Sequence, residues 1–376
     1  MHRRAYIEQI ESWLTEEKVL IMYGGRQVGK STILKILKER HSQMVILSCE
    51  DPNVRDAIKS QNKSRIKLLF GKATLVALDE AQKIENIGSL LKWIHDSEYF
   101  ESQIIATGSS SFELSNRVTE SLTGRNIKFF IYPYSLSELI DNFGGSWTVD
   151  HLEDLLIFGQ YPEIINSPID KKEQLLTNLA GDYLFQDVLQ FERLQNSGDL
   201  LKLLKLLAFQ IGSEVSFLEL SNEMGIAAQT VERYIDLLEK NFVIFRLDSY
   251  SRNLRNELKK SKKFYFYDLG IRNSLISNFS PLEFRHDKGA LWENFCVLER
   301  MKTRAINQKT VNHYFWRTYD QAKIDLVEES DGMLDIYEFK YKLKKRKVKF
   351  PQSFMAAYPV RDSHFISIKN FEELMT

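Results

Sequence analysis

A glycine-rich loop near the amino terminus constrains the fold of this chain more than any other feature. It lies between an apolar, strand-like run at 18–23 and a helix-like run at 33–39. The loop reads Gly24, Gly25, Arg26, Gln27, Val28, Gly29, Lys30, Ser31 and Thr32. This is the pattern G-x-x-x-x-G-K-[ST], whose glycines let successive backbone N–H groups turn toward a phosphate chain. The pattern predicts a phosphate-binding loop between a strand and a helix of a parallel sheet.

The residues of this loop have distinct expected roles. Lys30 is expected to reach the β- and γ-phosphates of ATP, and Ser31 to hold a magnesium ion. The backbone from Gly24 to Thr32 is the expected ATP-binding site. The alternative is a glycine-rich turn that binds nothing, which the flanking strand-like and helix-like runs disfavour.

Two acidic residues follow another apolar run, at 75–78. A buried parallel strand that delivers carboxylates to a ligand has this composition. Asp79 is expected to bind the magnesium ion through water, and Glu80 to polarise the attacking water as a general base. The pair could instead cap the next helix. Together the two motifs predict an ATPase, and the acidic pair with an additional strand-like run at 44–47 disfavours a kinase.

Three further residues are candidates for the catalytic site. Thr107 and Ser109 end the strand-like run at 103–107, and either could orient the lytic water; both could equally be helix caps. Arg125 precedes the strand-like run at 127–132 and is the candidate arginine finger, in cis or in trans. Its alternative is an ordinary surface arginine.

Composition excludes several classes of protein. The 51 basic and 51 acidic residues balance, so any nucleic-acid surface must come from local clustering. Cys49 and Cys296 are too far apart for metal-ligand spacing, which fits a reducing compartment and no disulfide framework. No apolar run approaches the roughly 18 residues that span a bilayer, so we expect a cytoplasmic protein without a membrane anchor.

The order of the runs predicts an α/β fold of several domains. Strand-like and helix-like runs alternate up to about residue 140, as in a parallel sheet with helices on both faces. A chain of 376 residues is also too long for one ordinary core. The expected parts are a P-loop parallel-sheet ATPase domain at 1–145, a helical connector or lid at 146–196, a winged-helix-like domain at 197–280, and a small α/β domain at 281–376.

The winged-helix prediction for 197–280 depends on a helix–turn–helix pattern followed by two strand-like runs. The loop between those runs is basic and would form the wing: Arg252, Arg255, Lys259, Lys260, Lys262 and Lys263. A basic wing beside a recognition helix suits phosphate contact. Winged helices also serve as packing modules between domains, and acidic residues on the second helix favour that alternative.

The last part of the chain contains a pattern typical of metal-dependent nucleases. Asp325 lies on one strand-like run, and Glu338 and Lys340 share a face of the next. Two carboxylates and a lysine could hold a divalent ion, Mg²⁺ or Mn²⁺, and activate a water; Glu293 on the preceding helix could add a ligand. A basic run at 340–349 could attract nucleic acid. The alternatives are a cross-strand salt bridge and a solvated face.

The whole chain resembles prokaryotic AAA+ type ATPases that carry a carboxy-terminal domain of unknown function. The motifs that carry the resemblance are 24–32, Leu78-Asp-Glu-Ala-Gln82, Ala106-Thr-Gly-Ser-Ser110, Leu122-Thr-Gly-Arg125, Gly159-Gln-Tyr-Pro-Glu163, Asp268-Leu-Gly-Ile-Arg272, Gly289-Ala-Leu-Trp-Glu-Asn294, Phe315-Trp-Arg-Thr318, and Asp325 with Glu338-Phe-Lys340. The resemblance implies ATP binding, ATP hydrolysis and a carboxy-terminal fold similar to PD-(D/E)XK restriction endonucleases. The chain departs from the family pattern in two places: Gln160 replaces a common glycine, and Ala322-Lys323, before Ile324-Asp325, stand where a glutamate is common.

Two functions remain open from the sequence. In the first, the nucleotide state of the ATPase controls a nuclease-like domain that acts on DNA or RNA. In the second, ATP gates a switch whose inactive nuclease fold binds a protein or nucleic acid. Assembly into a homo-oligomer is compatible with both.

Overall fold

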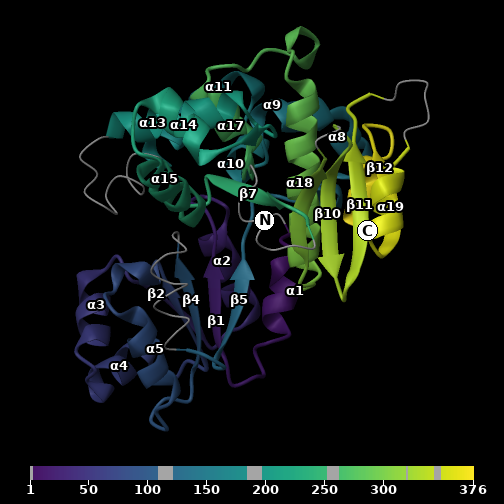
Figure 1. Ribbon diagram of the computed structural model, residues 1–376. Helices are drawn as coiled ribbons and strands as arrows, with labels where there is room; N and C mark the ends of the chain where they lie inside the picture. The colour runs from purple at the N-terminus through teal and green to yellow at the C-terminus, as the bar shows by residue number, and fades with distance from the viewer. Residues whose placement is uncertain (1–2, 109–121, 184–196, 252–261, 319–320, 343–348) are drawn as a thin grey trace. The chain divides into compact units, whose positions relative to one another are not determined.

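The computed structural model describes residues 3–108, 122–183, 197–251, 262–318, 321–342 and 349–376 (Figure 1). Ser109 and the greater part of the expected wing therefore lie outside the described residues. The chain divides into two compact units. The first comprises Met1–Pro133 with Lys240–Phe242, and the second comprises Tyr134–Glu239 with Val243–Thr376.

The first unit contains the expected parallel sheet. Its strands are β1 (Val19–Tyr23), β2 (Met44–Ser48), β3 (Leu75–Asp79), β4 (Gln103–Gly108) and β5 (Asn126–Phe130). They are ordered β2-β3-β4-β1-β5, and every neighbouring pair is parallel. All five predicted strand-like runs are strands, with ends that differ by a residue or two.

Helices cover both faces of this sheet, which is why its central strands β1, β3 and β4 are mostly apolar. They are α1 (Tyr6–Glu11), α2 (Lys30–Arg40), α3 (Pro52–Lys59), α4 (Lys63–Phe70), η1 (Ala81–Lys83) and α5 (Ile87–His95) (Figure 1). Val19 and Ile21 of β1 belong to the core beneath α3, α4 and α5. Successive side chains of a strand point to opposite faces, so Leu20 and Met22, also fully buried, face the other side.

The strand order determines where a ligand can bind. Because β4 lies between β1 and β3, the carboxyl ends of β1 and β3 flank the carboxyl end of β4. The glycine-rich loop follows β1, and Asp79 and Glu80 come at the end of β3. Ligands of open parallel sheets bind at this edge.

The second unit begins with helices. They are α7 (Leu136–Phe143), α8 (Gly145–Asp150), α9 (Leu152–Phe158), α10 (Pro162–Ile165), α11 (Ile169–Tyr183), α13 (Ser197–Phe209), α14 (Phe217–Met224), α15 (Ala228–Lys240) and α17 (Leu269–Leu275). The predicted break near Gly159 is present. A Cβ on Gly159 would lie 2.1 Å from Asp268 Oδ1, so only glycine lets the chain pass the buried carboxylate that caps α17.

One mixed sheet runs through the rest of the second unit. Its strands are β6 (Glu214–Val215), β7 (Ile244–Ser249), β8 (Lys262–Phe266), β9 (Asn312–Arg317), β10 (Lys323–Ser330), β11 (Met333–Phe339) and β12 (Val360–Ile366), in the order β12-β11-β10-β9-β7-β8-β6. The expected helix–turn–helix is present as α14 and α15, and the two strand-like runs that follow it form the hairpin of β7 and β8; the short strand β6 was not expected. The hairpin is not isolated, because β7 pairs in parallel with β9.

The carboxy-terminal strands pack between helices. The long helix α18 (Lys288–Ile306) runs beside β10 and β11 (Figure 1), and α19 (Gln352–Ala357) contributes Phe354 to a core with Trp316 and Val327. Two short 3-10 helices, η4 (Leu282–Phe284) and η5 (Phe371–Met375), complete the unit. None of the helices in the described ranges has the length and apolarity needed to cross a bilayer.

Candidate functional site

The glycine-rich loop is shaped by close backbone contacts. A Cβ on Gly24 would lie 2.0 Å from the carbonyl oxygen of Ile131, so no side chain fits there. Gly29 has a φ of 101°, in the left-handed region that favours glycine, and caps α2. The loop therefore runs directly into the amino end of an 11-residue helix, where free N–H groups favour an anion.

The Lys30 ammonium group lies inside this loop. Its Nζ donates to the carbonyl oxygens of Gly24 and Gly25 at 2.9 and 2.7 Å, and the residue is only 5% exposed. A positive charge is thus held among the backbone groups of the loop, at the place where the motif predicts the phosphates.

A chain of hydrogen bonds joins the loop to the acidic strand end. Ser31 Oγ donates to Asp79 Oδ2 at 2.9 Å, and Thr107 Oγ1 donates to Asp79 Oδ1 at 2.5 Å. The Thr107 hydroxyl also accepts from the backbone N–H of Glu80 at 3.1 Å. Thr107 is fully buried and holds both acidic residues; a role as sensor of the lytic water stays a prediction.

Glu80 has an unusual backbone conformation. Its φ of 57° lies in the left-handed region, which costs a non-glycine residue free energy. Its Oε2 accepts from Gln82 Nε2 at 2.5 Å. The sharp turn lets the Glu80 side chain leave the strand end beside Asp79, where both line one cleft.

That cleft has a volume of about 430 Å³ and is open on one side. Its lining residues are Arg26, Gln27, Gly29, Lys30, Ser31, Thr32, Ser48, Glu50, Asp79 and Glu80. The ammonium group and helix amino end suit a polyphosphate, and the adjacent hydroxyl and carboxylate oxygens of Ser31 and Asp79 suit Mg²⁺. The residues present therefore fit ATP and magnesium.

The sequence interpretation missed three residues near this cleft. Ser48 and Glu50 line it from the end of β2, and the rule that ligands bind at carboxyl strand ends could have identified them. Arg4 lies behind the loop, with Nη1 donating to the carbonyl oxygen of Val28 at 2.5 Å. No spacing in the sequence connects Arg4 with the loop.

Arg125 does not lie at the cleft. It precedes β5, at the amino edge of the parallel sheet, and its Nε donates to Asp96 Oδ1 at 2.7 Å. A five-residue strand spans roughly 16 Å, so Arg125 lies across the sheet from the loop that follows β1. This position does not support a role for Arg125 as an arginine finger in cis. A role in trans, which needs a second copy of the chain, stays a prediction.

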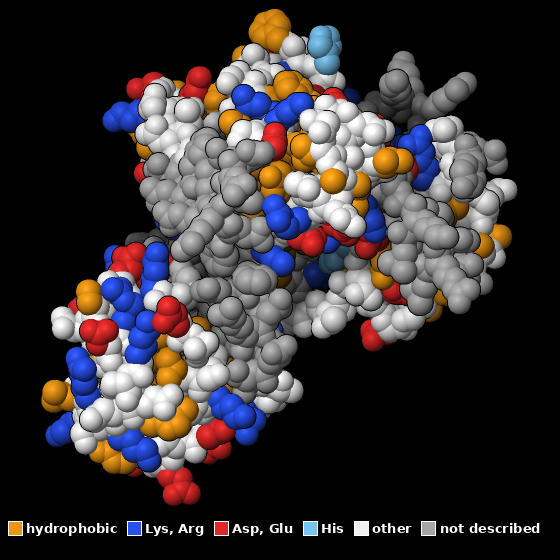
Figure 2. All heavy atoms as spheres, turned by 60° about the vertical axis from the view of Figure 1, so that its left-hand side comes forward, with side chains coloured by type: hydrophobic (Ala, Val, Ile, Leu, Met, Phe, Trp, Pro, Cys, Tyr) orange, Lys and Arg blue, Asp and Glu red, His pale blue; other side chains and the backbone are white. Residues whose placement is uncertain are grey.

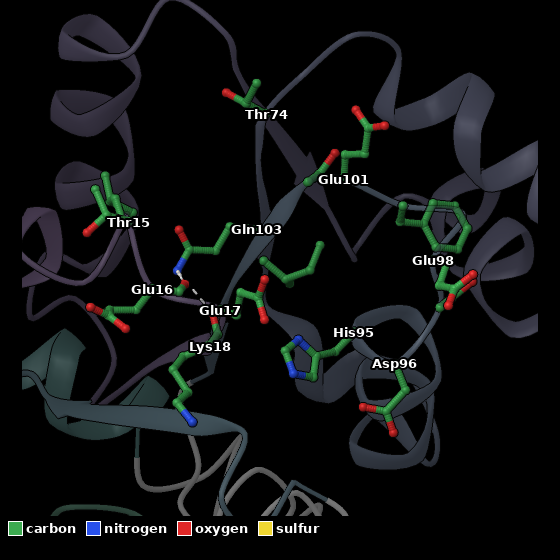
Figure 3. A pocket seen from close by; sticks show the side chains of 15 residues that line it. Thr15, Glu16, Glu17, Lys18, Thr74, His95, Asp96, Glu98, Glu101 and Gln103 are labelled. Carbon is green, nitrogen blue, oxygen red and sulfur yellow. Dashed lines mark hydrogen bonds between the residues drawn. The ribbon is translucent and has the colours of Figure 1, made fainter.

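A second cleft, of about 660 Å³, opens at that amino edge (Figure 3). Figure 3 shows carboxylates around it, from Glu16, Glu17, Asp96, Glu98 and Glu101. Gln103 Nε2 donates to the carbonyl oxygens of Trp13 and Glu16, each at 2.8 Å, and so secures the segment before β1. Although this cleft is the larger, its acidic rim would repel phosphates.

The structure brings three of the four expected nuclease residues together. The register that pairs Leu326 with Tyr337 puts Asp325 opposite Glu338. Lys340 Nζ donates to Glu338 and, at 3.5 Å, to Asp325 Oδ2. Burial alone would raise the pKa of Asp325, but the neighbouring lysines outweigh it and lower that pKa. Burial and then the Asp325 charge raise the pKa of Glu338.

Each of these carboxylates already has a lysine partner. Lys323 Nζ donates to Asp325 Oδ1 at 2.7 Å, and Lys340 serves Glu338. The fourth residue, Glu293, accepts from Lys263 Nζ and the Tyr265 hydroxyl, each at 2.7 Å, and lines a cleft of about 360 Å³ together with Lys263 and Lys323. Among the residues that the structure describes, no three His, Cys, Asp or Glu side chains are grouped to hold a metal ion. The arrangement does not fit the second divalent ion.

The described surface gives little support to a large basic patch. On the face in Figure 2, Lys and Arg side chains are interspersed with Asp and Glu. Of the expected wing, Lys262 pairs with Asp248 and Lys263 with Glu293. The basic residues at 343–348 lie outside the described residues.

The acidic residues on α15 are also partnered. Asp236 and Glu239 both pair with Arg246 of β7 at 2.9 Å. Burial raises the pKa of Glu239 to about 7. These acids are therefore tied to the hairpin, while Gln229, Glu232 and Arg233 remain exposed on the helix.

Comparison with protein families divides the chain in three. Residues 16–140 match an AAA domain. Residues 149–282 and 288–372 match two domains of unknown function, DUF8612 and DUF4143. The first segment contains the loop, Asp79, Glu80 and the whole parallel sheet.

The chain is also similar to full-length relatives and to a solved structure. A protein of Mycobacterium tuberculosis is 26% identical over 90% of this chain and 74% of its own length. A protein of Methanocaldococcus jannaschii is 25% identical over 90% of this chain and 79% of its own length. A Walker-type ATPase of Pyrococcus abyssi has a TM-score of 0.50 at 14% identity, over 73% of this chain and 95% of that one. The first unit thus has the fold of a P-loop ATPase and carries an AAA-type, ATP-binding domain.

Proposed function

We propose that the chain is a magnesium-dependent ATPase in which Glu80 is the general base. The observation that carries the proposal is the hydrogen bond between Ser31 and Asp79, which joins the phosphate-binding loop to the acidic strand end in one cleft. Lys30 and the backbone of the loop bind the phosphates. Ser31 and Asp79 hold the magnesium ion, which neutralises charge on the phosphates when bound.

The residues around Glu80 prepare it to take a proton. Thr107 fixes the backbone of Glu80 through the N–H at 3.1 Å, and Gln82 donates to its carboxylate. Glu80 then accepts a proton from a water that attacks the terminal phosphate. Asp79, already bound by two hydroxyl groups, is left to the metal.

Steady-state release of phosphate from ATP tests the role of Glu80. In Glu80→Gln the amide cannot accept the proton, so we expect hydrolysis to fall at least about a hundredfold while ATP still binds. The matched control is Glu85→Gln, because Glu85 is an exposed acid paired only with Lys59 on the surface. Hydrolysis by Glu80→Gln at the rate of the control would remove Glu80 from this role.

We also propose that the nucleotide state controls the second unit. The chain passes between the units at residues 133 and 134. On the first side, the Ile131 N–H donates to the Tyr23 carbonyl oxygen at 2.7 Å, next to the loop. On the second side, the Tyr134 carbonyl oxygen accepts from the buried Lys302 Nζ at 2.8 Å. Both ends of this short segment are held by hydrogen bonds. A movement of the phosphate-binding loop therefore displaces the backbone at Tyr134.

Of the two functions that the sequence leaves open, the switch is the better supported. Asp325, Glu338 and Glu293 are each paired with a lysine ammonium group, which competes with a catalytic metal for these three carboxylates. We therefore propose that the second unit binds a partner, nucleic acid or protein, without cutting it.

Incubation with DNA or RNA, ATP and either Mg²⁺ or Mn²⁺ distinguishes the two functions. The switch predicts intact substrate for the natural chain. Cleavage that Asp325→Ala abolishes would establish the nuclease instead. The variant Lys323→Glu removes one ammonium partner and adds a carboxylate, so it is expected to gain Mn²⁺ binding in the second unit; Lys309→Glu, at an exposed site, is the control.

A further inference from the structure

We propose that Arg4 is a positioning residue of the nucleotide site, which directs the backbone N–H of Gly29 toward the phosphates of ATP. The inference deepens the proposed ATPase function and depends on it. It adds a residue that lies outside every nucleotide-binding motif of the sequence.

Arg4 is held between two backbone segments of the first unit. It precedes α1 and is only 2% exposed. Nη1 donates to the Val28 carbonyl oxygen in the loop at 2.5 Å, and Nη2 donates to the Tyr132 carbonyl oxygen at 2.8 Å. A planar guanidinium group presents two separate nitrogens to two acceptors at a fixed angle, whereas a lysine has one nitrogen.

The bond to Val28 sets the orientation of the next N–H group. In a planar trans peptide, the C=O of one residue and the N–H of the following residue point in opposite directions. The Val28 carbonyl points to Arg4, away from solvent, so the Gly29 N–H points the other way. Gly29 lines the cleft that contains Lys30 and Ser31. The guanidinium group therefore keeps a backbone donor aimed into the phosphate site.

Gly29 and Arg4 also fit each other sterically. A Cβ on Gly29 would lie 2.9 Å from Arg4 Nη1, closer than carbon and nitrogen tolerate. The left-handed φ of Gly29 adds a second reason for glycine. The absence of a side chain at Gly29 thus leaves room for the Arg4 guanidinium group on one side of the loop, as well as for the phosphates on the other.

The charge of Arg4 acts in the same direction as its geometry. A guanidinium group stays protonated at every relevant pH. A donor that carries a positive charge polarises the Val28–Gly29 peptide and strengthens the N–H as a donor to phosphate. The second bond, to Tyr132, secures the guanidinium group against a segment that also packs on Gly24 through Ile131.

Titrations of Mg-ATP and Mg-ADP into variants of the full chain at Arg4 and Arg3 test the inference. For Arg4→Gln, the loss of a charge-assisted bond is expected to weaken both affinities about 10- to 100-fold. The rate at saturating ATP should stay within a few-fold, because the Gly29 N–H serves ground and transition states alike. Arg4→Lys, which keeps the charge but reaches one carbonyl, should bind more tightly than Arg4→Gln.

Arg3→Gln is the matched control. Arg3 is exposed and pairs with Glu8 at 3.0 Å. The same loss of charge at this neighbouring residue should therefore leave the nucleotide affinity and the rate of hydrolysis unchanged. If Arg4→Gln does not fold, the comparison of Arg4→Lys with Arg3→Lys decides. Nucleotide affinity of natural strength in the folded Arg4 variants would overturn the inference. An equal loss in Arg3→Gln would also overturn it, whereas failure of the natural chain to bind ATP would overturn the ATPase itself.

Discussion

Replacing Thr107 by valine isolates the hydroxyl group that holds the two acidic residues. Valine has the shape of threonine, so the change opens no cavity at this fully buried position. It removes the bond to Asp79 Oδ1 at 2.5 Å and the acceptor for the Glu80 N–H at 3.1 Å. Both acids lose their common anchor while the phosphate-binding loop keeps its own contacts.

The expected cost follows from the two lost bonds. A hydrogen bond to a charged group contributes about 1.5–3 kcal/mol, and a buried donor left unpaired costs about 1–3 kcal/mol. Because the Glu80 backbone is only half-buried, its N–H can find water, and the smaller figure applies. We therefore expect Thr107→Val to lower the free energy of unfolding by about 2–4 kcal/mol.

The catalytic effect should exceed any effect on ATP binding. A displacement of about 1 Å at reacting groups can cost about a hundredfold in rate. We expect the rate at saturating Mg-ATP to fall by about that factor, with the affinity for ATP changed less than about tenfold. The rate comes from phosphate release and the affinity from calorimetric titration.

Thr107→Ser is the matched control, since it keeps the hydroxyl group and loses one methyl group, at about 1 kcal/mol. The serine variant should hydrolyse ATP at close to the natural rate. Suppose that Thr107→Val also hydrolyses ATP at close to the natural rate and has the same free energy of unfolding as Thr107→Ser. The hydroxyl group then does not organise the acidic pair.

Two further predictions concern the second unit. Burial raises the pKa of Asp268 from 3.8 to about 6, so its ionised form costs the folded state about 3 kcal/mol. That part of the stability is present below about pH 4 and is lost as the pH rises through about 6. The melting temperature of Asp268→Asn should therefore depend less on pH over this range than that of the natural chain. Glu328 is buried between Arg300 and Arg304, so Glu328→Gln should cost about 3–5 kcal/mol at pH 7 in urea unfolding. Since His313 and Arg300 lower the pKa of Glu328 despite its burial, this loss should shrink as the pH falls below the ordinary pKa of a glutamate, and an unchanged loss in acid would contradict the assignment.

Local pattern was sufficient to predict the fold of the first unit and its loop. Both faces of a parallel sheet are buried, so continuous apolar runs mark its strands, and the motif spacing identifies Lys30 and Ser31. The same strand polarity, applied to Arg125, would have excluded it from the cleft in cis, because it comes before a strand. Arg4 could not be found this way, since its partners are carbonyl oxygens, which leave no trace in the sequence.

The carboxy-terminal cluster shows a different limit. The alternation of residues on strands correctly predicted that Asp325, Glu338 and Lys340 meet. Lys323 lies on the same strand face as Asp325. The sequence therefore also allowed the prediction that Lys323 competes with a metal ion for that carboxylate. The pairing of Lys263 with Glu293 could not be predicted from the sequence, because only the tertiary fold brings this hairpin strand and this distant helix together. The chemistry of the site depends on that pairing.

Calorimetric titration of Mg-ATP into the natural chain and Lys30→Ala tests the central claim most directly. Lys30 is the ammonium group held inside the loop by the Gly24 and Gly25 carbonyl oxygens. We predict one site for the natural chain and an affinity at least about tenfold weaker for Lys30→Ala, from the loss of a charged contact to phosphate. Equal heats of binding in the two proteins, or none in either, would contradict the assignment of this loop as the nucleotide site.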